Sequence, residues 1–307
     1  MSFRDRFQNL KETVGQWTDS TGGGSLDRKI ERNLAEMEGG TEIERTAAIK
    51  ALVIQAQIDD KWADPIITSF LRVLPGQLAS PQEAIIDGLL ELRKVKVSRE
   101  EEIFESIQET LDSPYPSVRS KVVDIWTRFS LKSDAKTSDT IAVLFEMLSD
   151  DDKDVRYQTQ ESLSKILHTV PKVALPELKN AIGDDDWRVT YHSIVLLTEF
   201  AKKYPDPSVA LAPEVIEAFN SGERLKERAA DCIGMLGLAN PEAVKPAVHG
   251  LIKGLESKSS ELRKACATAL GRIGSKNGMV VYHAVPRLAR ALKNDDWYIH
   301  VEVVKAL

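Results

Sequence analysis

The chain has 307 residues, of which 42% are hydrophobic, 6% aromatic and 29% charged, and its formal net charge at pH 7 is −6. This composition can fill a hydrophobic core, while the acidic balance argues against general binding of nucleic acid. No stretch reaches the roughly 18 apolar residues that span a bilayer, and the first residues lack the apolar segment of a secretory signal. The two cysteines, Cys232 and Cys266, stand in alanine-rich sequence typical of buried free thiols, so we expect a cytoplasmic protein.

Residues 1–25 differ from the rest of the chain. Apolar side chains recur there with a 4-3-4-3 spacing, which is the pattern of a short amphipathic helix. These residues are Phe3, Phe7, Leu10, Val14 and Trp17. The sequence TDSTGGGS follows and predicts a flexible tether. The helix either docks on the first hairpin of the next domain as a cap, or is a mobile arm that inserts into a partner groove or a membrane interface. Its polar residues carry both signs, which predicts only modest attraction to an anionic membrane: Arg4, Asp5, Arg6, Lys11 and Glu12.

Residues 26–307 contain one recurring pattern. An anchor residue x follows a polar turn, and apolar or small residues follow at x+4, x+7, x+8 and x+11, which lie on one face of a helix. The anchors are Val118, Val155, Val189, Leu225, Leu262 and Ile299. Successive anchors are separated by 37, 34, 36, 37 and 37 residues. Less exact copies start at Pro81 and near Ile43, so the sequence predicts about eight repeat units.

A second amphipathic segment lies between successive anchored helices, for example at residues 141–148, 175–182 and 248–255. Several of these segments are expected to begin near a proline, which the first turn of a helix tolerates. The prolines are Pro65, Pro176, Pro213, Pro246 and Pro286. Turns such as SDDDKD, GDDDWR, NSGER and ESKSSE supply N-cap oxygens to the anchored helices. We therefore predict an all-α fold, an α–α superhelix (solenoid) of about eight helical hairpins.

The turn and the start of each anchored helix carry a family resemblance. An Asp-rich turn precedes Val155–Arg156, and similar pairs open two later units that continue into Ile233–Gly234 and Ala269–Leu270–Gly271. This arrangement resembles the HEAT repeat, and the resemblance covers roughly residues 26–307. It implies stacked helical hairpins. It leaves function open, because HEAT repeats serve adaptors, transport receptors, phosphatase scaffolds and chromosome-organising subunits alike.

A basic residue stands next to most anchors. In a stack of repeats such residues recur on one face, and two interpretations are open. They form a cationic strip that binds an acidic peptide or a phosphate, or they pair with turn aspartates of their own or the adjoining unit and so orient the repeats. The residues are Arg119, Arg156, Arg188, Lys226 and Arg263.

The end of the sequence has two further features that point to partners. Residues 224–307 hold 14 Lys and Arg against 8 Asp and Glu, a balance of +6, whereas the preceding residues carry −12. A basic end could meet an acidic protein or lipid headgroups; nucleic acid is disfavoured because stacking aromatics do not accompany the basic residues. The last helix stays apolar up to Leu307, so we expect a continuation of the solenoid or another subunit to cover it.

Catalytic and metal-binding motifs were sought among the polar residues. The histidines form neither an HExxH motif nor the His–Glu pairs of iron-binding HEAT hydroxylases: His168, His192, His249, His283 and His300. GxSxG, P-loop and CxxC motifs are also absent. We expect no cofactor and no enzymatic activity, and we predict a protein-binding scaffold or adaptor. The alternatives are a HEAT-like DNA-binding protein, a HEAT-like DNA glycosylase using Asp186, Trp187 and Arg188, a HEAT-like chromophore lyase, or a subunit of a coat or chromosome-organising complex.

Overall fold

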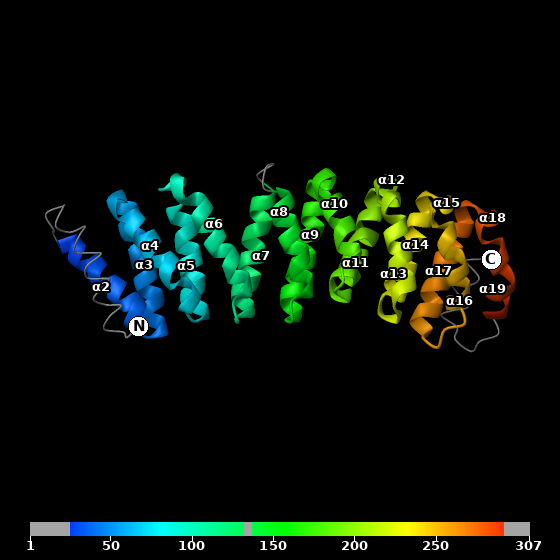
Figure 1. The fold of residues 1–307 in the computed structure, drawn as a ribbon, viewed down its shortest axis with the longest axis horizontal. Helices are drawn as coiled ribbons and strands as arrows, with labels where there is room; N and C mark the ends of the chain where they lie inside the picture. Colours follow the sequence, from blue (N-terminus) through cyan, green and yellow to red (C-terminus); the bar gives the residue numbers. More distant parts are fainter. Residues whose placement is uncertain (1–24, 132–136, 292–307) are drawn as a thin grey trace. The chain divides into compact units, whose positions relative to one another are not determined.

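The structure is a computed structural model, and it describes residues 25–131 and 137–291 (Figure 1). Every regular element in these two ranges is helical, as the sequence predicted. The predicted N-terminal amphipathic helix and the apolar last helix lie outside the described residues. The chain divides into two compact units, Met1–Val122 and Val123–Leu307, each of which is described by itself.

The first unit contains three pairs of helices in chain order. They are α2 (Ser25–Gly39) with α3 (Glu42–Ile58), α4 (Ala63–Val73) with α5 (Ala79–Leu92), and α6 (Glu100–Glu109) with α7 (Pro116–Ser130), whose second half belongs to the second unit. Short 3-10 turns extend several helices: η1 (Asp60–Trp62), η2 (Leu74–Gly76), η3 (Val97–Arg99) and η4 (Thr110–Asp112). Thr41 begins α3 with a reciprocal capping box to Glu44, which satisfies backbone donors that the first turn leaves unpaired.

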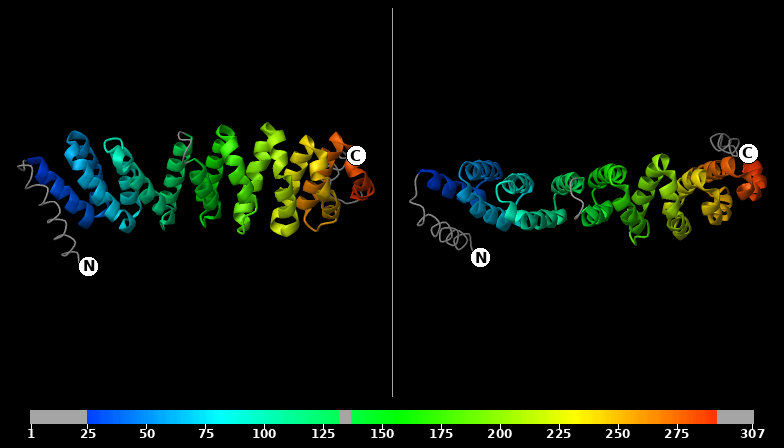
Figure 2. Two further views of the ribbon diagram at one scale, coloured as in Figure 1. Left: turned by 45° about the horizontal axis from the view of Figure 1, so that its top comes forward. Right: turned by 90° about the horizontal axis from the view of Figure 1, so that it is seen from above.

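The second unit continues the same alternation of helices in two layers (Figure 2). The anchored helices are α9 (Lys153–Thr169), α11 (Trp187–Lys203), α14 (Glu223–Ala239) and α17 (Ser260–Lys276). The intervening helices are α8 (Thr137–Glu146), α10 (Pro171–Ile182), α13 (Ala212–Ser221), α16 (Val248–Gly254) and α19 (Val285–Ala291). α9, α11, α14 and α17 pack side by side in one layer, while α8, α10 and α13 follow one another in the second. The described residues therefore hold seven hairpins and the first helix of an eighth.

In the last three described repeats, the intervening helix is divided in two by a 3-10 turn that contains or precedes a proline. A short helix and a 3-10 turn precede the longer helix in three units: α12 (Pro205–Ser208) with η6 (Val209–Leu211), α15 (Pro241–Val244) with η7 (Lys245–Ala247), and α18 (Gly278–Val281) with η8 (Tyr282–Ala284). Pro213 and Pro286 stand second in α13 and α19, as expected. The prediction for Pro176 was wrong: this residue lies inside α10, and Pro171 takes the first-turn position instead.

The repeat pattern coincides with the core. The five anchors in the described residues are buried, from Val118 to Leu262. The x+4 positions are buried too, and they are small where two layers meet, as with Thr159 and Ser193. Thr159 satisfies its hydroxyl by donating to the Val155 carbonyl at 2.8 Å. The predicted core positions of the anchored helices in the described residues are confirmed, except that Phe129 is half-buried.

The turns cap the anchored helices where their sequence supplies an oxygen. Asp152 accepts the backbone N–H of Asp154 at 2.8 Å, and Asp186 accepts that of Arg188 at 2.8 Å. In the turn ESKSSE, the Ser259 hydroxyl caps α17 in the same way. The turn NSGER differs from the prediction, because Gly222 occupies the N-cap of α14 and has no side chain to offer.

The two cysteines are buried free thiols, as predicted. Burial raises the pKa of both Cys232 and Cys266 to about 12. A thiol, unlike a thiolate, is a poor nucleophile, so neither residue is reactive near neutral pH. Among the described helices, none combines the length and the hydrophobicity needed to cross a membrane.

Candidate protein-binding surface

The basic column beside the anchors is held by bonds within the turns. The guanidinium of Arg119 donates to the carbonyl of Ser113 at 2.7 Å, six residues earlier. Arg156 donates in the same register to the carbonyl of Asp150, and Arg263 to that of Ser257 at 2.9 Å. These bonds satisfy carbonyls at the end of the preceding helix and tie the turn to the helix that follows.

The residue whose carbonyl accepts this hydrogen bond also accepts a second one through its side chain, from the backbone N–H two residues later. Asp150 accepts the backbone N–H of Asp152 at 2.8 Å, and Asp184 accepts that of Asp186 at 2.7 Å. Ser113 and Ser257 accept the N–H two residues later through their hydroxyls. A turn clamp is therefore defined by a Ser or Asp five residues before the anchor and a donor side chain directly after the anchor.

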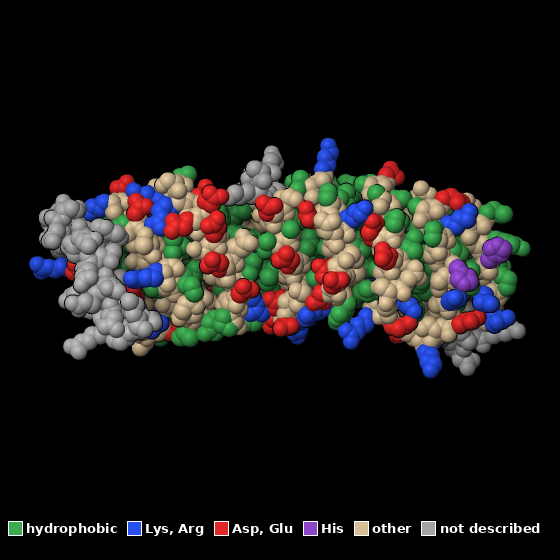
Figure 3. Space-filling view, in the orientation of Figure 1, with side chains coloured by type: hydrophobic (Ala, Val, Ile, Leu, Met, Phe, Trp, Pro, Cys, Tyr) green, Lys and Arg blue, Asp and Glu red, His purple; other side chains and the backbone are tan. Residues whose placement is uncertain are grey.

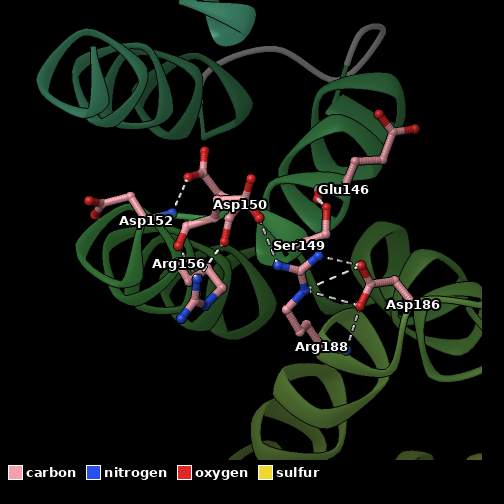
Figure 4. A network of polar contacts seen from close by, with 8 residues as sticks. Glu146, Ser149, Asp150, Asp152, Arg156, Asp186 and Arg188 are labelled. Carbon is pink, nitrogen blue, oxygen red and sulfur yellow. Dashed lines mark hydrogen bonds and ion pairs between the residues drawn. The ribbon is translucent and has the colours of Figure 1, made fainter. Parts of the chain in front are cut away.

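Two repeats lack an arginine as the donor of this clamp. In the unit anchored at Val189 the donor is Thr190, whose hydroxyl reaches the carbonyl of Asp184 at 3.1 Å. Arg188 therefore does not take part in the clamp and links two neighbouring repeats instead. Its Nη atoms lie 3.0 Å from a carboxylate oxygen of Asp151 and 3.0 Å from one of Asp186. Figure 4 shows Arg188 beside Asp186. Lys226 instead forms an ion pair with Glu223 in its own helix.

Arg188 connects the turn before α9 with the start of α11, which is the pairing with turn aspartates that the sequence suggested for the whole column. Its hydrogen bond lowers the pKa of Asp186 below the usual range. Asp186 is thus both a helix cap and an ion-pair partner. Of the three residues considered for a glycosylase, Trp187 is the one with a large exposed side chain, 42% of its surface.

Trp187 borders an open pocket of about 600 Å³ in the second unit. The walls come from the turn between α10 and α11 and from α13, the following turn and the start of α14. Five of the lining residues are acidic and one is basic: Asp184, Asp185, Glu214, Glu217, Glu223 and Arg224. The pocket therefore combines an aromatic wall with an excess of negative charge.

Neighbouring side chains hold Trp187 in place. The guanidinium of Arg224 lies over its ring, 4.8 Å from the centroid. Tyr191, one turn further along α11, meets the ring edge-on with the centroids 6.4 Å apart. Tyr191 is itself fixed by Arg228, whose Nε donates to the phenol oxygen at 3.0 Å. Such contacts preorganise an exposed aromatic side chain for binding.

The acidic lining is only partly neutralised. Glu214 pairs with Lys179 through one oxygen at 3.1 Å, but its other oxygen is buried and has no hydrogen-bond partner. Within the described residues, Asp185 and Glu217 have neither a hydrogen bond nor an ion pair. Asp185 and Glu217 are exposed at the pocket. The pocket is therefore suited to a ligand that brings positive N–H groups to these two carboxylates.

Sequence reasoning did not find this pocket. Its two walls are some thirty residues apart and belong to two consecutive repeats of the second unit. Trp187 was the sequence feature that could have indicated a binding site. It stands two residues before the anchor Val189, outside the core positions of the repeat, so a large aromatic side chain is expected on the surface there. In the described part of the chain, no group of three His, Cys, Asp or Glu side chains has the arrangement needed to hold a metal ion.

The acidic and basic side chains are also unevenly distributed over the surface of the second unit. Figure 3 shows acidic side chains over α8–α11, and Lys, Arg and His side chains gathered over α16–α19. One basic side chain of this end, Arg287, reaches Glu256 at 3.5 Å. The predicted binding residues of the N-terminal segment, Phe3 to Trp17, lie outside the described residues.

Known proteins share the family motif and the fold. Residues 104–198 match the family described as HEAT repeats. The karyopherin Kap121p bound to the SUMO protease Ulp1p superimposes with a TM-score of 0.60 at 13% identity, covering 99% of this chain and 37% of that one. Kap95p in a complex with RanGDP gives 0.55 at 16% identity, covering 92% and 41%. An engineered protein gives 0.50 at 15% identity, covering 98% and 93%.

This chain is thus much shorter than the karyopherins that it resembles, and the identities are low enough that the likeness concerns the fold. No curated protein matches the sequence. The repeat motif, the hairpins and the structural neighbours agree with one another. Residues 104–198 thus match HEAT repeats, and the described residues have an all-α fold of stacked helical hairpins like that of the solenoid proteins named above.

Proposed function

We propose that this protein is a non-catalytic scaffold or adaptor that binds a partner protein through the Trp187 pocket. The observation that carries the proposal is the pocket itself, in which an exposed, fixed tryptophan lies beside Asp185 and Glu217, two carboxylates with no hydrogen bond or ion pair among the described residues. Structures of the similar karyopherin Kap121p include complexes with Pho4p and with RanGTP, so protein recognition is compatible with such a fold.

The partner segment in this proposal carries a lysine or arginine side chain. The basic column that favoured an acidic partner is engaged in turn clamps or in ion pairs with Asp and Glu. The excess charge at the candidate site is negative. A cation on an exposed aromatic ring contributes about 0.5–1 kcal/mol. Each exposed ion pair with a carboxylate adds about 0.2–1 kcal/mol. Together these contributions favour a basic residue flanked by apolar ones, and they predict weakening by salt.

Two pools of fluorescent nine-residue peptides would test the proposal, one with a central arginine and the other with a central glutamate. The arginine pool is expected to bind the full chain, and Glu217→Lys to weaken that binding about tenfold or more, since an attraction becomes a repulsion worth roughly 1.4 kcal/mol or more. Glu199→Lys is the matched control, because Glu199 lies on α11 away from the pocket and pairs with Lys202. Equal binding of both pools, or equal effects of both variants, would contradict the proposal.

A further inference from the structure

Helix α3 exposes three isoleucines on one face. The exposed fractions are 83% for Ile43, 57% for Ile54 and 72% for Ile58. At 100° per residue these side chains fall within an arc of about 60°, and they extend over about 22 Å of helix. Ala47 lies in the same arc and is exposed, while exposed Lys50 lies about 20° outside the arc, midway along the helix. Four apolar side chains gathered on one face of a surface helix indicate an interaction site.

The isoleucine stripe is separate from the core contacts of α3. The buried side chains of this helix, such as Ile49 and Leu52, point about 180° away from it, towards α2, α4 and α5. Nothing in the described fold therefore uses the stripe, and it is also distinct from the Trp187 pocket, which belongs to the other unit.

The chain itself contains a segment of matching length and pattern. In helical geometry, the apolar residues from Phe3 to Trp17 would fall within an arc of about 80° over about 21 Å. Arg4 and Lys11 would flank this apolar stripe on one side and Arg6 on the other. The acidic residues of the segment would lie on the opposite face. The segment therefore combines an apolar stripe with basic edges.

The connection allows the two stripes to meet. The side chain of Asn33, in the middle of α2, donates to Gln55 near the end of α3 at 3.3 Å, so the half of α2 that leads back to Ser25 lies towards the end of α3. Residues 18–24 can span up to about 24 Å when extended, enough to bring Trp17 beside Ile58. The segment would then run along α3 with Phe3 towards Ile43.

Charge complementarity favours the same arrangement. Glu42 marks the edge of the stripe that faces α5, where its carboxylate accepts a hydrogen bond from Ser80 at 2.7 Å. On α5, Asp87 is already paired with Lys121 of α7 at 2.8 Å. Glu42 is therefore the carboxylate that borders this side of the stripe, where a basic edge of the segment would lie.

We propose that residues 3–17 fold back as a helix along α3 and cover Ile43, Ile54 and Ile58. The N-terminal segment is then an intramolecular cap on the first hairpin. It is not an arm that reaches for other molecules.

Disulfide formation between introduced cysteines measures this docking directly. Val14→Cys and Ile54→Cys would face each other in the proposed arrangement. The native cysteines do not compete, because burial raises the pKa of both to about 12. The matched control pairs Val14→Cys with Arg32→Cys, because the Arg32 side chain is 77% exposed on α2 and closer to Val14 along the chain. A segment that moves freely would reach Arg32→Cys at least as readily.

We expect the Val14–Ile54 pair to close within one chain at least tenfold faster than the control pair. A second variant, Ile43→Asp with Ile58→Asp, alters only exposed side chains, so the fold is retained. It should increase trypsin cleavage after Arg6 and Lys11 about tenfold. Equal closure rates, disulfide-linked dimers, or unchanged cleavage would overturn the proposal. So would a full chain that sediments with phosphatidylserine vesicles while the Val14–Ile54 pair stays open.

Discussion

The close approach of α14 and α17 gives a sharp test of the packing in the second unit. Gly234 on α14 faces the backbone of α17 at Ala269. A Cβ atom at Gly234 would lie 2.8 Å from the Cα of Ala269 and 3.1 Å from its Cβ. Because those atoms belong to the backbone of α17 or are attached directly to it, no side chain can rotate away. Gly234→Ala must therefore move the two helices apart.

The size of the effect follows from two opposing contributions. Carbon atoms pack best at about 3.5–4.0 Å, so the helices must separate by somewhat less than about 1 Å, which weakens their other contacts. Overpacking of this kind costs about 1–3 kcal/mol. Alanine is favoured over glycine inside a helix by about 0.8–1.0 kcal/mol. We expect a net loss of about 1 kcal/mol in the free energy of unfolding.

Urea unfolding followed by circular dichroism measures this loss as a lower midpoint at unchanged slope. Gly278→Ala is the control, because no atom lies within 4 Å of the added Cβ and the backbone angle is compatible with alanine. That variant should equal the wild type or be slightly more stable. If Gly234→Ala is as stable as Gly278→Ala, the close approach of α14 and α17 is wrong.

Three other predictions concern the turns and the core. Arg156→Ala removes the turn clamp on two carbonyls before α9, and we expect thermal denaturation to report a loss of about 1–3 kcal/mol; the same substitution at exposed Arg32 should have little effect. Asp186→Asn keeps the helix cap but loses the ion pair with Arg188. Since the folded pKa of Asp186 is lowered, its charge stabilises the fold above about pH 4 and this contribution is lost as the pH falls through the lower folded value; urea titrations should show a difference below about 1 kcal/mol at pH 7 and a smaller one at pH 2.5. Cys232 and Cys266 should react with a thiol reagent at pH 8 only after unfolding; rapid labelling of the native chain would contradict their burial.

The spacing of residues along the sequence was sufficient to predict the helices and their repetition. A helix buries residues three and four positions apart, so the anchor pattern from Val118 to Leu262 predicted the core of each anchored helix without any knowledge of its neighbours. The caps of Asp152 and Asp186 also follow from short range, because an N-cap bonds to N–H groups two or three residues away. The N-terminal helix and the apolar last helix stay predictions of the same kind.

Tertiary structure decided what those side chains do. The sequence showed a column of basic residues, but an arginine can reach a carboxylate or a carbonyl, and only the turn geometry selects the carbonyl six residues before Arg156 or Arg263. Stacking of one unit on the next brought Trp187 beside Glu214 and Glu217 and created the pocket. The distance between neighbouring helices of one layer depends on the small residues that meet between them, such as Gly234 of α14 against Ala269 of α17. Contacts between residues about thirty-five positions apart leave no periodic signal in a single sequence. The repeat could therefore be predicted from the sequence, whereas the Trp187 pocket could not.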